Sequence, residues 1–229
     1  MYENMNIIEI ITAPIRFIIE YVTNRIAVWR ERRRYHEQIS EYLEQIQKLD
    51  NKYRPEKPDV IVAQQCRDYL SEAFPTGIKE KVGQMSQEEL MELFKDIESN
   101  AESLLGVHVD VVDFYTSEEQ PICGYCGYYS QSDNSLHVNA ALLLSGNVDL
   151  IEEQVYTIFH ELKHARQWAA VMGTADYGYS DELLRSWAEN MQSYIPPYEG
   201  DELYRKQPLE LDTFGFESIL KGEKQFETT

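Results

Sequence analysis

The chain contains an HExxH pattern, His160-Glu161-Leu162-Lys163-His164. Side chains four residues apart lie on one face of a helix, so the two imidazoles can share one metal ion. The carboxylate of Glu161, next to the first histidine, can accept a proton from a metal-bound water and later pass it to a leaving amine. The pattern therefore predicts a zinc site suited to the hydrolysis of peptide bonds.

The residues around this pattern predict the helix that it needs. An apolar stripe recurs at steps of about 100° per residue and comprises Ile151, Val155, Ile158, Leu162 and Ala165. The two histidines lie roughly opposite this stripe and next to each other. Histidines that only fill a core belong on the apolar stripe, and a chance surface pair does not explain the glutamate between them. We therefore favour the metal-site interpretation over both.

A zinc site of this type needs a third protein ligand. No histidine follows His164, because the remaining three, His36, His108 and His137, all come earlier in the chain. A carboxylate from a later helix is therefore the expected third ligand. The chain after Gly173 offers these glutamates: Glu182, Glu189, Glu199, Glu202, Glu210 and Glu217.

The segment QPLELDTFGF, residues 207–216, resembles the E-x-x-A-x-x-F-A-type helix that follows HExxH in ImmA/IrrE-like metallopeptidases of bacteria and mobile elements. The stretch GYYSQSDNSLHVN ahead of the motif is similar to the strands that precede their HExxH helix. The resemblance spans residues 107–218 in outline and depends on about a dozen positions. It implies a gluzincin-type zinc peptidase of bacterial or phage origin. It also implies Glu210 as the third ligand and Asp212 as a carboxylate that orients a ligand histidine.

The chain departs from that family pattern at two points. Thr213 and Gly215 stand where small alanines are typical, and the insert SWAENMQSYIPPYEGDELYRK lengthens the gap before Glu210. The insert carries Glu189 on a further expected helix, and thermolysin-like proteins take their third ligand from such a helix. Glu210 is favoured, and Glu189 stays open as the alternative ligand.

The same insert is rich in tyrosine. The hydroxyls of Tyr194, Tyr198 and Tyr204, or the guanidinium of Arg205, could stabilise the oxyanion of a tetrahedral intermediate. Such residues more often pack a loop, so none is singled out for this role.

Periodicity and capping residues predict the remaining helices. A helix at 60–74 ends at Pro75, and Ser86 with Glu89 forms a capping box for another. Further helices are expected near Ile151, Asp181 and Pro208.

Three segments are predicted to be strands because they alternate or are rich in β-branched and aromatic residues. They cover residues 107–115, 125–130 and 136–139, and the last two form a hairpin. The expected fold is α+β: a zincin-like domain with a small antiparallel or mixed sheet packed on the HExxH helix. In such folds a substrate lies along an edge strand, which we expect near 136–139.

Charge divides the chain near Pro55 and Pro58. Lys and Arg number 10 against 9 Asp and Glu through Lys57, but 11 against 31 after it. We expect a helical arm at residues 1–57, followed by the zincin-like metallopeptidase domain at 58–229. The arm carries a basic stripe, which could dock on the acidic domain or mediate self-association.

Composition excludes several classes of protein. The chain has 229 residues and a net charge of −19, which disfavours nucleic-acid binding because phosphates would be repelled. The N-terminal segment has no basic lead and carries Glu3 and Glu9 early, so no signal peptide is expected. Glu9, Arg16 and Glu20 interrupt its apolar run, so no transmembrane segment is expected either. Three cysteines, an odd number, favour a reducing compartment and hence a cytoplasmic location.

Three other features are expected to have no role in chemistry. Cys123 and Cys126 form a C-x-x-C pair, but a structural zinc would need two more ligands and the pair falls in a strand region. His108 and His137 fall in strand-like stretches and are expected to be structural.

Together these residues predict a zinc-dependent endopeptidase that acts on proteins or peptides. One zinc ion would be held by His160, His164 and Glu210, with Glu161 as the general base. The acidic domain would favour basic or neutral substrates. The alternative is a metal-bound zincin-like module that binds or regulates a partner without cleaving it.

Overall fold

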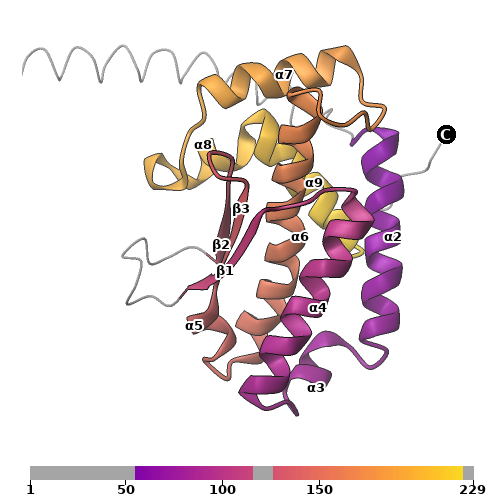
Figure 1. The fold of residues 1–229 in the computed structure, drawn as a ribbon, viewed down its shortest axis with the longest axis vertical. Helices are drawn as coiled ribbons and strands as arrows, with labels where there is room; N and C mark the ends of the chain where they lie inside the picture. The colour runs from indigo at the N-terminus through magenta and orange to yellow at the C-terminus, as the bar shows by residue number, and fades with distance from the viewer. Residues whose placement is uncertain (1–54, 116–125, 224–229) are drawn as a thin grey trace, which may run out of the picture. The chain divides into compact units, whose positions relative to one another are not determined.

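The computed structural model describes residues 55–115 and 126–223, all of which belong to one compact unit, Lys52–Thr229. Nearly all of the expected arm, and Cys123, lie outside the described residues, so the expectations for them stay predictions. The unit is mixed α+β and mostly helical, with a small three-stranded mixed sheet (Figure 1). The predicted α+β class is confirmed.

Helices make up most of the described chain. They are α2 (Lys57–Ala73), α3 (Ile78–Val82), α4 (Gln87–Leu105), α5 (Ala140–Leu143), α6 (Val148–Val171), α7 (Asp181–Gln192), α8 (Asp201–Lys206) and α9 (Pro208–Leu220), with a 3-10 helix, η1, at Pro197–Glu199. No helix within residues 55–115 and 126–223 has the length and apolar character needed to cross a bilayer.

The predicted helices form where capping residues and proline favour them. The capping box of α4 is present: the Glu89 amide donates to Ser86 Oγ, and the Ser86 amide donates to the Glu89 carboxylate. The helix α2 begins at Lys57, three residues earlier than expected. Pro58 lies in its first turn, where a missing amide proton removes no helical hydrogen bond.

The sheet has the strand order β1-β3-β2, with β1 at Val111–Tyr115, β2 at Gly127–Ser130 and β3 at Ser135–Asn139. The predicted hairpin is confirmed, since β2 and β3 pair antiparallel. The expected position of the edge strand is wrong. Strand β3 is central because β1 also pairs with it, in parallel, which leaves β2 at the edge beside α6.

The HExxH helix, α6, lies at the centre of the unit (Figure 1). Its apolar stripe is buried from Ile151 to Ala165, and α4 packs against the helix together with the inner sheet face of Leu136 and Val138. Helix α9 also packs along α6. The histidine face is therefore covered by protein as well.

Gly127 lets the edge strand approach α6 closely. A Cβ at this position would lie 2.7 Å from the His137 carbonyl oxygen and 3.0 Å from Thr157 Cγ2, closer than side chains pack. Only glycine fits without moving β2 away from the HExxH helix.

Candidate metal centre

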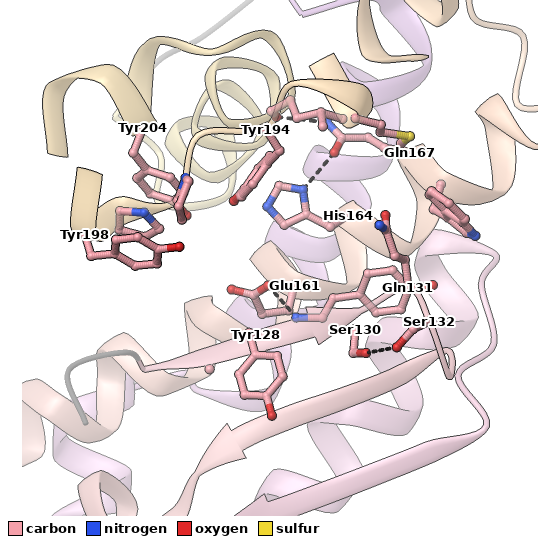
Figure 2. A pocket seen from close by; sticks show the side chains of 17 residues that line it. Tyr128, Ser130, Gln131, Ser132, Glu161, His164, Gln167, Tyr194, Tyr198 and Tyr204 are labelled. Carbon is pink, nitrogen blue, oxygen red and sulfur yellow. Dashed lines mark hydrogen bonds between the residues drawn. The ribbon is translucent and has the colours of Figure 1, made fainter. Parts of the chain in front are cut away.

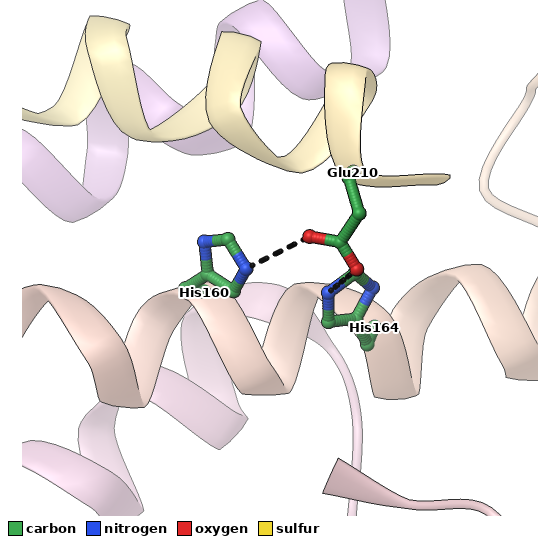
Figure 3. Close-up of side chains that lie close together, drawn as sticks. All are labelled: His160, His164 and Glu210. Carbon is green, nitrogen blue, oxygen red and sulfur yellow. Dashed lines mark ion pairs between the residues drawn. The ribbon is translucent and has the colours of Figure 1, made fainter. Parts of the chain in front are cut away.

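Three potential ligands converge between two helices. His160 and His164 project from α6 toward Glu210, which projects from the first turn of α9 (Figure 3). His160 Nε2 lies 3.4 Å from Glu210 Oε2, and His164 Nε2 lies 3.2 Å from Glu210 Oε1. One ligand atom from each residue falls within 4.8 Å of the other two. Two imidazoles and one carboxylate are a donor set that zinc commonly takes.

The Glu210 carboxylate fits a metal ligand better than an ordinary buried acid. It is fully buried, and Tyr194 donates a 2.7 Å hydrogen bond to Oε1. Among the described residues Oε2 has no hydrogen-bond partner of normal geometry, and His160 Nε2 lies 3.4 Å from it. A buried carboxylate oxygen with incomplete bonding, aimed between two imidazoles, is suited to a cation.

The alternative ligand, Glu189, lies elsewhere. It is exposed on α7 and is not part of the group formed by His160, His164 and Glu210. The structure thus brings the favoured acid to the imidazole pair and leaves the alternative in solvent.

Each histidine is oriented by a hydrogen bond at Nδ1. His160 Nδ1–H donates to Glu217 Oε2 at 2.9 Å, and His164 Nδ1–H donates to Gln167 Oε1 at 2.8 Å. The Gln167 amide group donates to the Leu209 carbonyl and to Asp212, so its oxygen must face His164. With Nδ1 bonded to these acceptors, Nε2 of each ring faces Glu210 and is the nitrogen that a metal would bind on displacing its proton.

The structure places Asp212 next to Gln167 and Lys163. It is fully buried, but its carboxylate bonds Gln167 Nε2 at 2.8 Å and Lys163 Nζ at 2.6 Å, so it acts on His164 through Gln167. Glu217 is the carboxylate that bonds a ligand histidine directly. It lies on α9 two turns beyond Glu210, and this spacing on one helix face could have identified it.

Burial and charge shift the pKa of each group in the centre. Burial favours neutral His160, but the carboxylates of Glu210 and Glu217 outweigh this effect and raise its pKa well above the usual value. Burial likewise favours protonated Glu210, but the imidazoles of His164 and His160 hold its pKa well below the usual range. The carboxylate is therefore ionised and ready to bind a cation.

Glu161 is held by the edge strand. The Tyr129 amide of β2 donates a 2.9 Å hydrogen bond to Glu161 Oε2. Burial raises the pKa of Glu161, as is usual for a carboxyl group poised to act as a base. The edge strand thus fixes the proposed base beside the histidine pair.

Glu161 and His164 line a cleft with a volume of about 540 Å³ (Figure 2). The hairpin from Gly127 to Ser132 forms one side, and the tyrosines of the insert form the other. The insert tyrosines in the lining are Tyr194, Tyr198 and Tyr204. Burial, followed by the charge of Glu210, raises the pKa of Tyr194 and of Tyr204, which keeps both hydroxyls protonated.

Arg205 does not line this cleft. Its guanidinium bonds Asp201 and lies 4.7 Å above the ring of Phe214. Arg205 thus shares the ring of Phe214 with Tyr204 but lies outside the cleft lining.

A buried charge cluster, consisting of Lys163, Asp59, Asp212, Tyr179 and Arg166, lies behind the histidine pair. Lys163 Nζ is 3.0 Å from Asp59 Oδ1 and 2.6 Å from Asp212 Oδ2, and all three side chains are fully buried. Tyr179 donates a 2.5 Å hydrogen bond to Asp59 and accepts one of 2.8 Å from Arg166. The cluster joins α2, α6 and α9. It was not expected from the sequence, because its charges lie far apart along the chain.

His137, His108 and Cys126 have no place in the metal centre. His137 lies on β3 between Asp113 at 3.1 Å and Ser135 at 2.8 Å, and its ring stacks on Tyr128 at 4.3 Å. This resembles a Ser-His-Asp arrangement, but Ser135 is only 1% exposed and cannot reach a substrate. His108 is largely exposed, and Cys126 is a free thiol whose pKa is raised by burial.

Replacing Glu217 by Leu should weaken zinc binding by about 10–100-fold, because the His160 ring loses its acceptor at Nδ1. Glu217→Gln keeps a hydrogen-bond acceptor for Nδ1 and should lose less zinc affinity. Competition with a chromophoric chelator measures the dissociation constant, with Glu182→Leu on exposed α7 as the control. Equal affinity for the wild type and Glu217→Leu would show that the ring needs no support from α9.

Comparison of the chain with models of known protein families, with curated proteins and with solved structures finds no match.

Proposed function

We propose that this chain is a zinc-dependent endopeptidase with a zincin-like domain of the gluzincin type. One observation carries the proposal: Glu161 stands beside the His160, His164 and Glu210 group, and it shares with His164 a cleft bordered by an edge strand. The resemblance of residues 207–216 to ImmA/IrrE-like metallopeptidases is consistent with it.

Each residue of the metal centre would have its own role in hydrolysis. His160, His164 and Glu210 would hold a zinc ion, which when bound polarises a carbonyl and lowers the pKa of water. Glu161 would take the proton of the attacking water and deliver it to the leaving amine. Tyr194, bonded to Glu210 Oε1, fixes the orientation of the ligand carboxylate.

The edge strand supplies a way to hold an extended peptide. The Asn139 amide donates to the Cys126 carbonyl, so the register places the backbone groups of Gly127 and Tyr129 on the side of β2 that faces away from β3. The Tyr129 amide bonds Glu161, so a peptide would bond the Tyr129 carbonyl and the backbone of Gly127. Both residues line the cleft. A peptide that adds to this edge would lie across Glu161 and His164.

The proposal includes a cytoplasmic location and a preference for basic or neutral substrates. Cys66 and Cys126 are free thiols, which suits a reducing compartment. The excess of 31 acidic over 11 basic residues after Lys57 would repel acidic peptides. Docking or self-association through the N-terminal arm, residues 1–57, stays part of the proposal.

Metal analysis combined with digestion of a diverse peptide library tests the function. We expect one zinc per chain, cleavage that stops on treatment with a chelator, and recovery when zinc is restored. Glu210→Ala should lose both zinc and cleavage, whereas the matched Glu189→Ala, exposed on α7, should keep both.

Two outcomes would contradict the proposal. A wild-type protein that takes up no divalent ion would remove the metal centre altogether. A protein that holds one zinc but cleaves nothing in the library would instead support the alternative, a metal-bound interaction or regulatory module.

A further inference from the structure

The cleft is aromatic and almost free of charge, although the domain around it is strongly acidic. Of the described residues that line it, only Glu161 and His164 carry groups that ionise near neutral pH. Six lining residues are aromatic: Tyr128, Tyr129, Trp168, Tyr194, Tyr198 and Tyr204. Such a lining favours apolar contact with a ligand over the pairing of charges.

One part of the lining is apolar and adjoins the metal centre. Trp168 follows His164 by four residues on α6, so it lies one turn further along the same face. Leu209 directly precedes Glu210, and Met191 comes from the end of α7. All three side chains line the cleft, although Leu209 is 95% buried and Trp168 and Met191 are half-buried. We call these three residues the apolar subsite.

Polar clamps hold the α7 and α9 parts of this subsite in place. Asn190, next to Met191, accepts a 3.0 Å hydrogen bond from the Leu209 amide through Oδ1 and donates to Gln207 Oε1 through Nδ2. Gln207 in turn bonds both the amide and the carbonyl of Ile195, at 2.9 and 2.8 Å. Asn190 and Gln207 are both buried, so these bonds are shielded from water.

The opposite side of the cleft is also fixed. The Tyr128 ring stacks on His137 at 4.3 Å with an interplanar angle of 12°, and His137 is bonded to Asp113 and Ser135. The Tyr129 hydroxyl donates to Asn134 at 3.0 Å. A cleft with both sides preorganised discriminates between ligands by the shape and polarity of their side chains.

We infer that the apolar subsite selects peptides with a large aromatic or aliphatic side chain next to the bond that is cut. This inference depends on the proposed function, because it places the selected residue beside Glu161 and the zinc ligands. An acidic side chain would lose its water in a cleft that offers it no cation among the lining residues. A small side chain would leave the surface of Trp168 uncovered.

Cleavage and binding experiments test the inference separately. In the library digest, cut sites should be enriched about tenfold or more in Phe, Leu or Met at one flanking position, relative to Ala or Glu. Fluorescein-labelled Ala-Ala-Xaa-Ala-Ala peptides, with Xaa as Phe, Leu, Ala or Glu, should show the same order of affinity for the zinc-loaded Glu161→Gln protein in fluorescence anisotropy.

Variants at Trp168 connect the preference to the subsite. Trp168→Ala should bring the affinity for the Phe peptide close to that for the Ala peptide, and Trp168→Phe should largely restore it. Met172→Ala is the matched control, because Met172 is 51% exposed at the end of the same helix and does not line the cleft.

The two possible failures are distinguishable. Cleavage without any preference for large apolar residues, equal binding of the four peptides, or a preference that survives Trp168→Ala would overturn the subsite while leaving the peptidase intact. Absence of both zinc and cleavage would overturn the proposed function. The anisotropy series, run on the metal-free Glu161→Gln protein, would still decide whether the cleft selects apolar side chains.

Discussion

Replacing Glu161 by Gln is expected to lower proteolytic turnover by about 10²–10⁴-fold while one zinc stays bound per chain. The glutamine amide cannot accept the proton of the attacking water, but its oxygen can still accept the hydrogen bond from the Tyr129 amide. Neither nitrogen ligand nor the Glu210 carboxylate is altered. Turnover of a peptide identified in the library digest, together with metal content, provides both readouts.

Glu153→Gln is the matched control for this variant. Glu153 lies on α6, two turns before Glu161, and its side chain is exposed. It should retain wild-type turnover and zinc content. Proteolysis by Glu161→Gln at the wild-type rate, with zinc bound, would remove Glu161 from the mechanism.

Replacing Lys163 by Met should reduce the free energy of unfolding by about 3–5 kcal/mol. The change leaves the carboxylates of Asp59 and Asp212 facing each other in the interior without their shared cation. Even with Lys163 present, burial raises the pKa of Asp59 to about 6. Chemical denaturation at fixed zinc concentration measures the loss, and Lys95→Met, at an exposed position on α4, should change stability by less than about 0.5 kcal/mol.

The sign of the pH dependence provides a second check on this variant. Without Lys163 the pKa of Asp59 loses the charge that lowers it and stays above its unfolded value. The contribution of Asp59 therefore favours folding at a pH below the unfolded pKa and is lost as the pH rises. The deficit of Lys163→Met relative to wild type should therefore be larger at pH 8 than at pH 5. A deficit that does not change with pH would show that lost packing, and not charge, causes the instability.

Local sequence patterns were enough to predict the main parts of the fold. Period 3.6 with capping residues identified α4 and α6, and alternation with a polar turn identified the β2–β3 hairpin. The parallel pairing of β1 with β3 has no local signal, because the strands are joined through other segments. For that reason the sequence predicts an edge strand at 136–139, whereas in the structure this strand is central and β2 is the edge strand beside α6.

The candidate site shows the same division between local and distant information. His160, Glu161 and His164 follow from spacing on one helix. Glu217 and Gln167, which orient the histidines, were missed because a glutamate or glutamine on a helix is usually solvated. Along the chain, Glu217 is 57 residues from its partner His160. Gln167 is 42 residues from Leu209, whose carbonyl accepts its hydrogen bond. The HExxH pattern leaves the residue at position 163 open, so it does not indicate that Lys163 is fully buried.

The clamp between Gln207 and Ile195 has a consequence for protein engineering. The segment between these two residues contains η1 and α8. The hydrogen bonds between Gln207 and Ile195 join its two ends, independently of the residues between them. Segments of other lengths and sequences could therefore be grafted between these anchor points, provided that they keep the contact of Tyr204 with Glu210. The same domain would then carry interchangeable segments at the border of the cleft, each designed to recognise a different peptide.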